Sequence, residues 1–229
     1  MREIVFDTET TGLDPKTGDR MVEIGCVEMV NLVPTGNTFH AYYNPERDMP
    51  AGAEAVHGLS AAFLADKPLF RDTAGELLDF LGDAPLIAHN AGFDFGFLNA
   101  ELTLIEFEPV CMSRMIDTVA IAKKRHPGAK LSLDALCTRY GIDRSHRVKH
   151  GALLDAELLA QVYVELKGGR QIGLGLAAES VTATVTQEMV AVRRAPDGPR
   201  REPRPHAPTP EELARHRKFM SGIENPLWG

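Results

Sequence analysis

The sequence opens with an apolar run that ends on two carboxylates, Ile4-Val5-Phe6-Asp7-Thr8-Glu9, before a Thr-Thr-Gly turn. A short apolar run bounded by turn residues is typical of a buried β-strand, and residues i and i+2 of a strand point to the same face. Asp7 and Glu9 would then stand side by side, which is unfavourable for like charges unless a cation lies between them. The pair therefore suggests a metal site; the alternative is a polar strand end that runs into a turn.

Strand patterns come first in the chain and helical patterns follow. After the opening strand, alternation predicts strands at 21–30 and 38–43 in an antiparallel meander, and later a short strand at 85–88 and another element opening at 116–118. The segment from Asn44 to Ser60 is expected to be a loop in which Ser60 is a helix N-cap. Helical spacing predicts helices at 70–81, 93–104, 119–125, 132–140 and 153–166. This order favours an α/β fold, a mixed sheet flanked by helices.

The composition changes after Gly168-Gly169, which we expect to end the last of these helices. The stretch 193–208 is rich in proline and arginine and nearly devoid of apolar side chains, as in linkers. Thr209-Pro210-Glu211-Glu212 then predicts a capped helix start, and 213–220 a short amphipathic helix. Because so short a helix is marginal in water on its own, we expect it to bind a partner.

The net charge of −7 is unevenly distributed along the chain. Residues 1–170 carry 17 basic and 25 acidic side chains, a formal charge of −8, whereas the remaining 59 residues carry +1. Because binding to nucleic acid depends on basic side chains that release counterions, so acidic a domain would need bound cations or a partner that delivers the strand. Only 123–149 is locally basic, with eight basic residues against two acidic ones.

The sequence shows no sign of a membrane or secreted protein. It contains no run of 18 apolar residues and its first residues already read as a strand, so we expect neither a membrane span nor a signal peptide, and a cytoplasmic location by default. Cys26, Cys111 and Cys137 are an odd number without CxxC spacing. This argues against a disulfide framework and against a zinc site.

Two further segments carry candidate chemistry. In His89-Asn90-Ala91-Gly92-Phe93-Asp94, Asp94 falls in the first turn of a helix, either as an ordinary helix-start acid or as a third metal-site carboxylate. His89 by itself is more often a core or capping histidine. In His150-Gly151-Ala152-Leu153-Leu154-Asp155, His150 would precede a helix and Asp155 would project from its second turn. A surface-loop histidine is the alternative for His150.

Together these groups suggest metal-assisted phosphodiester hydrolysis. Three or four carboxylates around two divalent cations about 4 Å apart can stabilise the attacking and leaving oxygens of an in-line displacement. Mg²⁺ suits such hard oxygen ligands. A histidine that is neutral near physiological pH and lies outside the ligand set can take the proton of the attacking water.

Three segments resemble, in order and spacing, the exonuclease motifs of the DEDD superfamily in its histidine variety. They are Asp7-x-Glu9-Thr10-Thr11-Gly12, His89-Asn90-Ala91-x-Phe93-Asp94 and His150-x-Ala152-x-x-Asp155. The likeness runs from residue 3 to about 167 and is closest to the proofreading subunits of bacterial replicative DNA polymerases. It implies an RNase H-like fold with a mixed five-stranded sheet, and removal of deoxynucleotides in the 3′ to 5′ direction.

The resemblance also implies roles for individual residues. Asp7, Glu9 and Asp155 would be ligands of two Mg²⁺ or Mn²⁺ ions, Asp94 would complete the site directly or through waters, and His150 would be the general base. The implied substrate contacts are Asp7, Glu9, Thr10, Thr11, Leu13, His57, Asn90 and Asp155. Just before His57 the sequence departs from the family pattern, which leaves open whether Glu54 takes the part of an acidic residue there.

Partners follow from the same resemblance. Residues 171–176 resemble a sliding-clamp-binding peptide with Gln171, Leu174 and Leu176 as anchors, although an ordinary linker is the alternative. After a linker at 177–208, the tail at 209–229 would tether the exonuclease domain, residues 1–170, to the polymerase. The expected anchors of this tail are Leu213, Phe219, Leu227 and Trp228. A small theta-like subunit is left open.

Two other functions compete with proofreading. A stand-alone 3′ to 5′ exonuclease acting on RNA or short oligonucleotides would use the same chemistry, but it would not need a linker that ends in an apolar anchor. A non-catalytic scaffold between polymerase and clamp would not need the carboxylates and the histidine.

Overall fold

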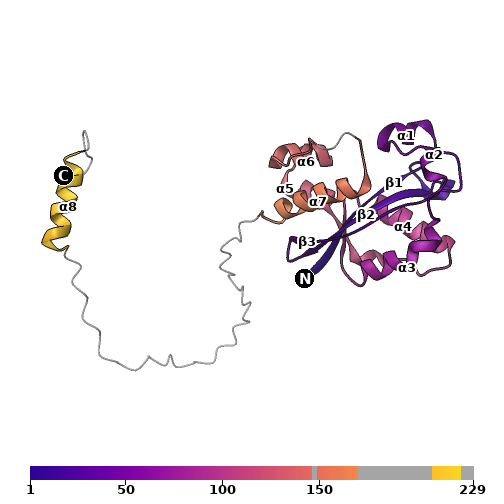
Figure 1. The fold of residues 1–229 in the computed structure, drawn as a ribbon, viewed down its shortest axis with the longest axis horizontal. Helices are drawn as coiled ribbons and strands as arrows, with labels where there is room; N and C mark the ends of the chain where they lie inside the picture. The colour runs from indigo at the N-terminus through magenta and orange to yellow at the C-terminus, as the bar shows by residue number, and fades with distance from the viewer. Residues whose placement is uncertain (146–148, 170–207, 223–229) are drawn as a thin grey trace, which may run out of the picture. The chain divides into compact units, whose positions relative to one another are not determined.

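The computed structural model describes residues 1–145, 149–169 and 208–222 (Figure 1). The chain divides into two units, Met1–Ala177 and Ala178–Gly229, which are considered separately. The predicted clamp-binding residues Gln171, Leu174 and Leu176, the predicted linker at 177–208 and the predicted anchors Leu227 and Trp228 lie outside the described residues, apart from residue 208. The predicted domain boundaries therefore stay predictions.

Five strands of the described chain form one mixed sheet in the order β3-β2-β1-β4-β5. The strands are β1 (Arg2–Thr10), β2 (Met21–Val30), β3 (Val33–Tyr42), β4 (Leu86–Ala88) and β5 (Met115–Asp117). The first three pair antiparallel, whereas β4 pairs parallel to both β1 and β5. The predicted meander and the mixed sheet are confirmed.

Strand β3 begins five residues earlier than 38, the start that the alternation predicts. Pro34 and Gly36 hide the strand pattern in the sequence. Pairing with β2 nevertheless holds this segment extended, with Pro34 opposite Met29 and Val33 opposite Val30. Because β3 is an edge strand, a proline there costs no ladder hydrogen bond.

The helices of the first unit confirm the predicted ones within two residues at each end. They are α3 (Phe70–Leu81), α4 (Gly92–Leu104), α5 (Thr118–Arg125), α6 (Leu133–Tyr140) and α7 (Ala152–Leu166), with the short α2 (Ala61–Leu64) capped by Ser60 as expected. Short 3₁₀ turns occur at Pro15–Thr17 and Met112–Arg114. None of the helices in the described part of the chain is long and apolar enough to cross a membrane.

One helix contradicts the sequence analysis. The expected loop before His57 contains α1 (Ala51–His57), which follows Pro50 and ends where Gly58 takes a left-handed conformation, φ 79°. Gly52 and the small alanines leave no apolar stripe, so periodicity cannot reveal this helix. Pro50 at its N-cap and Gly58 just past its end are the signals that mark it.

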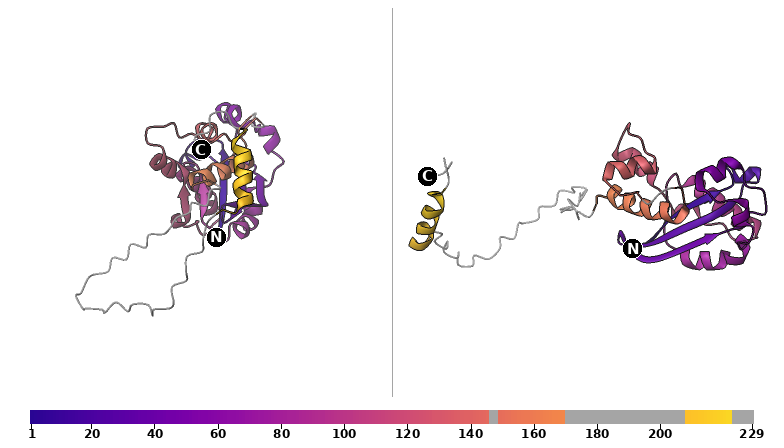
Figure 2. Two further views of the ribbon diagram at one scale, coloured as in Figure 1. Left: turned by 90° about the vertical axis from the view of Figure 1, so that its left-hand side faces the viewer. Right: turned by 45° about the horizontal axis from the view of Figure 1, so that its top comes forward.

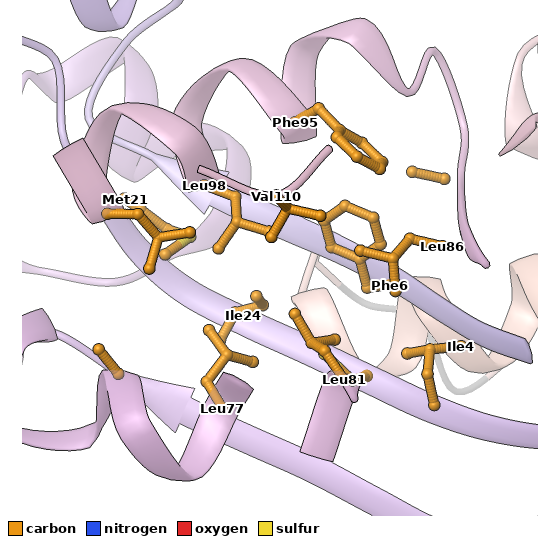
Figure 3. Packing of buried hydrophobic residues seen from close by; sticks show 14 of the residues in the cluster. Ile4, Phe6, Met21, Ile24, Leu77, Leu81, Leu86, Phe95, Leu98 and Val110 are labelled. Atoms are coloured by element: carbon orange, nitrogen blue, oxygen red, sulfur yellow. The ribbon is translucent and has the colours of Figure 1, made fainter. Parts of the chain in front are cut away.

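Helices cover both faces of the sheet (Figures 1 and 2), and an apolar core lies on each face. Ile4 and Phe6 of β1 pack with residues of α3 and α4, such as Leu81 and Phe95, as Figure 3 shows. Val5 of β1 points the other way, into a cluster with Leu159 and other residues of α7. The faces of β1 therefore alternate as a strand requires, with odd-numbered residues toward α7.

The second unit contains α8 (Pro210–Met220). Thr209 accepts a hydrogen bond from the backbone of Glu212, whose side chain in turn accepts from the Thr209 backbone, which confirms the predicted capped start. Leu213 is 40% exposed and Phe219 is 69% exposed.

Candidate active site

Strand β1 delivers Asp7 and Glu9 to the face covered by α7. On that face Glu3 accepts a hydrogen bond from the Tyr163 hydroxyl of α7 at 2.9 Å, and Val5 packs in the α7 cluster. Asp7 and Glu9 continue this row of odd-numbered residues. The expected placement of both carboxylates on one face of the strand is confirmed.

Helix α7 begins directly above this row because Gly25 allows it. Gly25 pairs with Asp7 across β1 and β2. A Cβ atom placed on Gly25 would lie 2.2 Å from the backbone nitrogen of Leu153, so the first turn of the helix touches the strand. Asp155 lies in the first turn rather than the expected second one, because it is only three residues after Ala152, where α7 starts.

Three of the predicted site residues form one cluster. Glu9, His150 and Asp155 each offer a ligand atom, and these atoms all lie within 4.8 Å of one another. His150 Nδ1 is 3.1 Å from Asp155 Oδ2. The His150 side chain is 47% exposed, whereas that of Asp155 is only 4% exposed. The imidazole therefore stands at the solvent side of the carboxylates, closer to them than a base outside the ligand set was expected to be.

Asp94 reaches β1 from helix α4, on the side of β1 that faces β4. Strand β4 pairs with β1 only as far as Val5, so it leaves the Thr8 backbone without a strand partner on that side. Asp94, in the first turn of α4, accepts from the Thr8 backbone at 3.1 Å and from the Thr8 hydroxyl at 2.8 Å. It is thus a helix-start acid, and it also reaches the end of β1.

The other carboxylates of the site lie close enough to raise the pKa of Asp7. Burial is the largest cause that raises the pKa of Asp7 well above its ordinary value, followed by the charges of Asp94, Glu9, Asp155 and Glu23. Burial also raises the pKa of Asp94 to about 7, although its bonds to Thr8 act in the opposite direction. Buried like charges of this kind call for a cation, and an all-oxygen carboxylate set fits a hard divalent ion.

Comparisons with known proteins identify the family. The sequence matches the exonuclease family over residues 4–163. It is 50% identical over 226 residues to the DNA polymerase III subunit epsilon of Rickettsia felis, an alignment that covers 97% of each chain. The chain belongs to the DNA polymerase III epsilon-subunit family of exonucleases.

More distant relatives agree with this assignment. The epsilon subunit of Escherichia coli is 45% identical over 188 residues, which cover 79% of this chain and 77% of that one. Among solved structures, exonuclease X in complex with a 5′-overhanging duplex DNA is 26% identical, with a TM-score of 0.56 over 71% of this chain and 89% of that one. The nuclease domain of 3′hExo, a DEDDh family member bound to rAMP, shares the fold with a TM-score of 0.63 at 18% identity, over 72% of this chain and 91% of that one. The expected RNase H-like fold is confirmed.

In this epsilon-family chain, α1 brings His57 to the site. His57 is 5% exposed, and its Nδ1 accepts a hydrogen bond from the Leu59 backbone at 3.0 Å. The Thr10 carbonyl is near enough to influence the pKa of the imidazole, but Nε2 makes no hydrogen bond within the described residues. Burial is the main cause that lowers the pKa of His57. A neutral imidazole with a buried, unsatisfied ring nitrogen suits a role in holding substrate.

The remaining predicted contacts lie on the loops that frame the site. The Thr10 hydroxyl bonds to the Gly12 carbonyl at 2.6 Å, and the Thr11 hydroxyl accepts from the Arg20 backbone at 3.0 Å, so both threonines shape the turn after β1. Leu13 beyond this turn is 85% exposed.

The segment after β4 places two more of the predicted residues. Asn90 has a left-handed backbone, φ 65°, and its backbone N–H donates a hydrogen bond to Asp117 Oδ1 at 3.1 Å. His89 lies 2.9 Å from the Thr118 hydroxyl, as its structural interpretation predicts.

Sequence reasoning missed a fifth carboxylate, Glu23. It is 2% exposed, lies opposite Glu9 in the β1–β2 register, and contacts His40 Nε2 at 2.7 Å. No motif marks it, because its position depends on which residues of β1 and β2 face each other. The apolar–acidic alternation Val22-Glu23-Ile24 would have identified it only if that register had been known.

Gly25→Ala is expected to displace the start of α7 and thereby lower both stability and activity. The new methyl group would collide with backbone atoms of α7, so we expect a loss of stability of about 2–3 kcal/mol and nuclease activity at least tenfold lower, as Asp155 and His150 shift. Thermal unfolding and single-strand degradation measure the two effects. Gly75→Ala is the control, because Gly75 lies in α3 with nothing within 4 Å of an added Cβ. Equal activity in Gly25→Ala and Gly75→Ala would contradict the view that the contact between Gly25 and the first turn of α7 positions the site.

Proposed function

We propose that this chain removes mispaired nucleotides from the 3′ end of a DNA strand, as the proofreading subunit of a bacterial replicative polymerase in the cytoplasm. The observation that carries the proposal is the meeting of three distant segments at the end of β1. There Asp7 and Glu9 lie beside Asp94 and beside the paired His150 and Asp155. The family of this chain consists of exonucleases, and its epsilon relatives align over nearly the whole sequence.

The carboxylates would hold the divalent cations on which this family of exonucleases depends. We assign Asp7, Glu9, Asp94 and Asp155 as the residues that would hold two ions, Mg²⁺ or Mn²⁺. When bound, the ions supply stabilisation of the charge that develops on the attacking and leaving oxygens of the phosphodiester. The raised pKa values of Asp7 and Asp94 support the assignment, since a bound cation would offset the burial and the neighbouring negative charges that raise them.

His150 is the group we assign to move the proton. If Nδ1 carries its hydrogen and donates it to Asp155 Oδ2, at 3.1 Å, then Nε2 is left as an acceptor. That nitrogen can take the proton of the attacking water, while Asp155 fixes the orientation of the ring. The exposure of the imidazole allows the proton to leave to solvent.

The surrounding residues would orient the last nucleotide of the strand. We assign this role to Thr10, Thr11, Leu13, His57 and Asn90. Two observations support this role. The buried Nε2 of His57 has no hydrogen-bond partner within the described residues, and the exposed side chain of Leu13 can contact a base. Glu54 lies in α1, partly exposed, three residues before His57, and its role stays a prediction.

A primer-extension substrate tests the proposal. With Mg²⁺, the purified chain should shorten a primer that carries a mismatched 3′ terminus, release mononucleotides, and act more slowly on the same strand made of RNA. A label at the 5′ end and a label at the 3′ end distinguish the two directions. Degradation that starts at the 5′ end, or degradation that persists in EDTA, would refute the mechanism. Preference for RNA would favour the stand-alone exonuclease instead.

Helix α8 is the part of the tail through which we propose binding to the polymerase. Leu213 and Phe219 expose apolar surface on a short helix that has little reason to be stable by itself, and Leu227 and Trp228 are the further proposed anchors. We also keep 171–176 as the proposed clamp-binding peptide, and a theta-like subunit as a possible partner of the exonuclease domain.

Deleting residues 207–229 is expected to separate catalysis from assembly. The shortened chain should degrade free single strands at the rate of the full chain, since residues 1–169 contain every proposed catalytic group. It should no longer co-elute with the polymerase subunit in size-exclusion chromatography. Leu213→Glu with Phe219→Glu in the full chain is the matched variant, because it keeps the length and removes the apolar surface. Co-elution that survives both changes would show that the anchors lie elsewhere.

A further inference from the structure

Lys149 lies at the exposed edge of the site, which we call its mouth, between the start of α7 and the end of α1. It directly precedes His150, and its side chain extends away from α7 to the end of α1. A Cβ atom placed on Gly58 would lie 2.6 Å from Cδ and 2.9 Å from Nζ of Lys149. The ammonium group therefore lies beside Gly58, next to the buried His57.

The charge of Lys149 is available to a ligand. The residue is exposed, and no carboxylate of the described ranges forms an ion pair with it, whereas Arg144 on the same loop is paired with Asp134 at 2.8 Å. Its charge does reach His57, where it contributes to the lowered pKa. The ammonium group thus faces the space where we expect the end of the strand.

The electrostatics of the site explain why a cation is needed there. Five buried or half-buried carboxylates converge below the mouth: Asp7, Glu9, Glu23, Asp94 and Asp155. Divalent ions would neutralise them around the scissile phosphate, but the neighbouring phosphates of the strand would still approach an acidic surface. A flexible lysine is a mobile point charge that suits a phosphate oxygen rather than a base edge.

We infer that Lys149 binds a backbone phosphate next to the scissile one and thereby holds the strand between α1 and α7. The inference rests on the proposed function. Lys149 acts as a positioning residue, since it touches the strand without taking part in the proton transfer. Its contribution should be independent of base sequence, because it contacts the backbone alone.

Kinetics of Lys149→Ala on single-stranded DNA with Mg²⁺ test the inference. We expect KM to rise about 5- to 10-fold with kcat within a factor of two, equally for oligothymidylate and oligodeoxyadenylate. The slope of log KM against log salt should become shallower by about 0.7, the value for one phosphate contact on a single strand. Lys149→Arg should restore most of the affinity, because it keeps the charge.

Lys124→Ala is the matched control, since it removes the same charge far from the site. Lys124 lies on α5 beside Arg125, which bonds to the Leu166 carbonyl at the opposite end of α7 from Asp155. We expect its KM and salt slope to equal those of the wild type. If Lys149→Ala behaves like Lys124→Ala, or if Lys149→Arg is as weak as Lys149→Ala, the inference is wrong.

Binding in EDTA keeps this test separate from the proposed function. Fluorescence anisotropy of a labelled oligothymidylate measures affinity when no strand is cleaved. A wild type that cleaves no DNA would refute the proposed function, yet a weaker binding of Lys149→Ala than of Lys124→Ala would still support the phosphate contact. Equal binding by these two variants would overturn it.

Discussion

Asp7→Asn is expected to abolish hydrolysis and, at the same time, to make the metal-free protein more stable. The change keeps the shape of the side chain and removes one negative charge from the centre of the site. Because we assign Asp7 as a residue that would hold the cations, its loss should lower kcat by about 10³-fold, the scale of losing a major electrostatic contribution. Single-turnover degradation of a 3′-labelled strand measures it.

The gain in stability follows from the raised pKa of Asp7. A carboxyl whose pKa is higher in the folded than in the unfolded state keeps a proton that the unfolded chain releases. The stability of the metal-free wild type should therefore fall as pH rises from about 4, the ordinary carboxyl pKa, up to the raised value. Asp7→Asn lacks this loss, so the two proteins should unfold at similar temperatures near pH 4.

At pH 8 in EDTA the variant should be the more stable of the two and should unfold at the higher temperature. Addition of Mg²⁺ should raise the Tm of the wild type much more than that of Asp7→Asn, since a ligand stabilises only the state that binds it. Asp79→Asn, at an exposed position of α3, is the control for charge alone. An Asp7→Asn variant that is less stable at pH 8, or one that responds to Mg²⁺ like the wild type, would contradict the assignment.

Local patterns in the sequence were enough to propose the catalytic groups, whereas their arrangement in space depends on nonlocal pairing. Asp7 and Glu9 are two positions apart on one strand, so the period of the strand alone predicts their common face. Asp94 could be placed at a helix start, but its bonds to Thr8 depend on β4 ending before β1 does. That difference in strand length cannot be seen in either segment alone.

Glu23 and Gly25 show the same limit. Both lie on β2, where the alternation predicts the strand correctly, and neither belongs to a motif. Their importance comes from the β1–β2 register, which sets Glu23 opposite Glu9 and Gly25 opposite Asp7. Helix α1 was missed for a local reason instead, because small residues leave it without an apolar period. Its consequence is nonlocal, since its last turn carries His57 to the site.

His150→Ala is expected to slow the chemical step while the divalent cations still bind. A positioned general base contributes about 10²–10⁴-fold, so kcat should fall by that range. His150 nevertheless lies within the cluster of Glu9 and Asp155, where it could also serve as a ligand. The two roles differ in one measurable quantity, the affinity for Mn²⁺, which isothermal titration calorimetry reports without any turnover.

If His150 is the base, the variant should bind Mn²⁺ within about threefold of the wild type, because the carboxylate ligands we assign remain. His126→Ala is the matched control, since His126 contacts the Tyr140 hydroxyl at 2.7 Å and has no part in the proposed site. A His150→Ala variant that loses Mn²⁺ affinity as severely as Asp155→Asn would instead make the imidazole a ligand. The attacking water would then need another proton acceptor, and the buried Glu23 would be the first residue to replace.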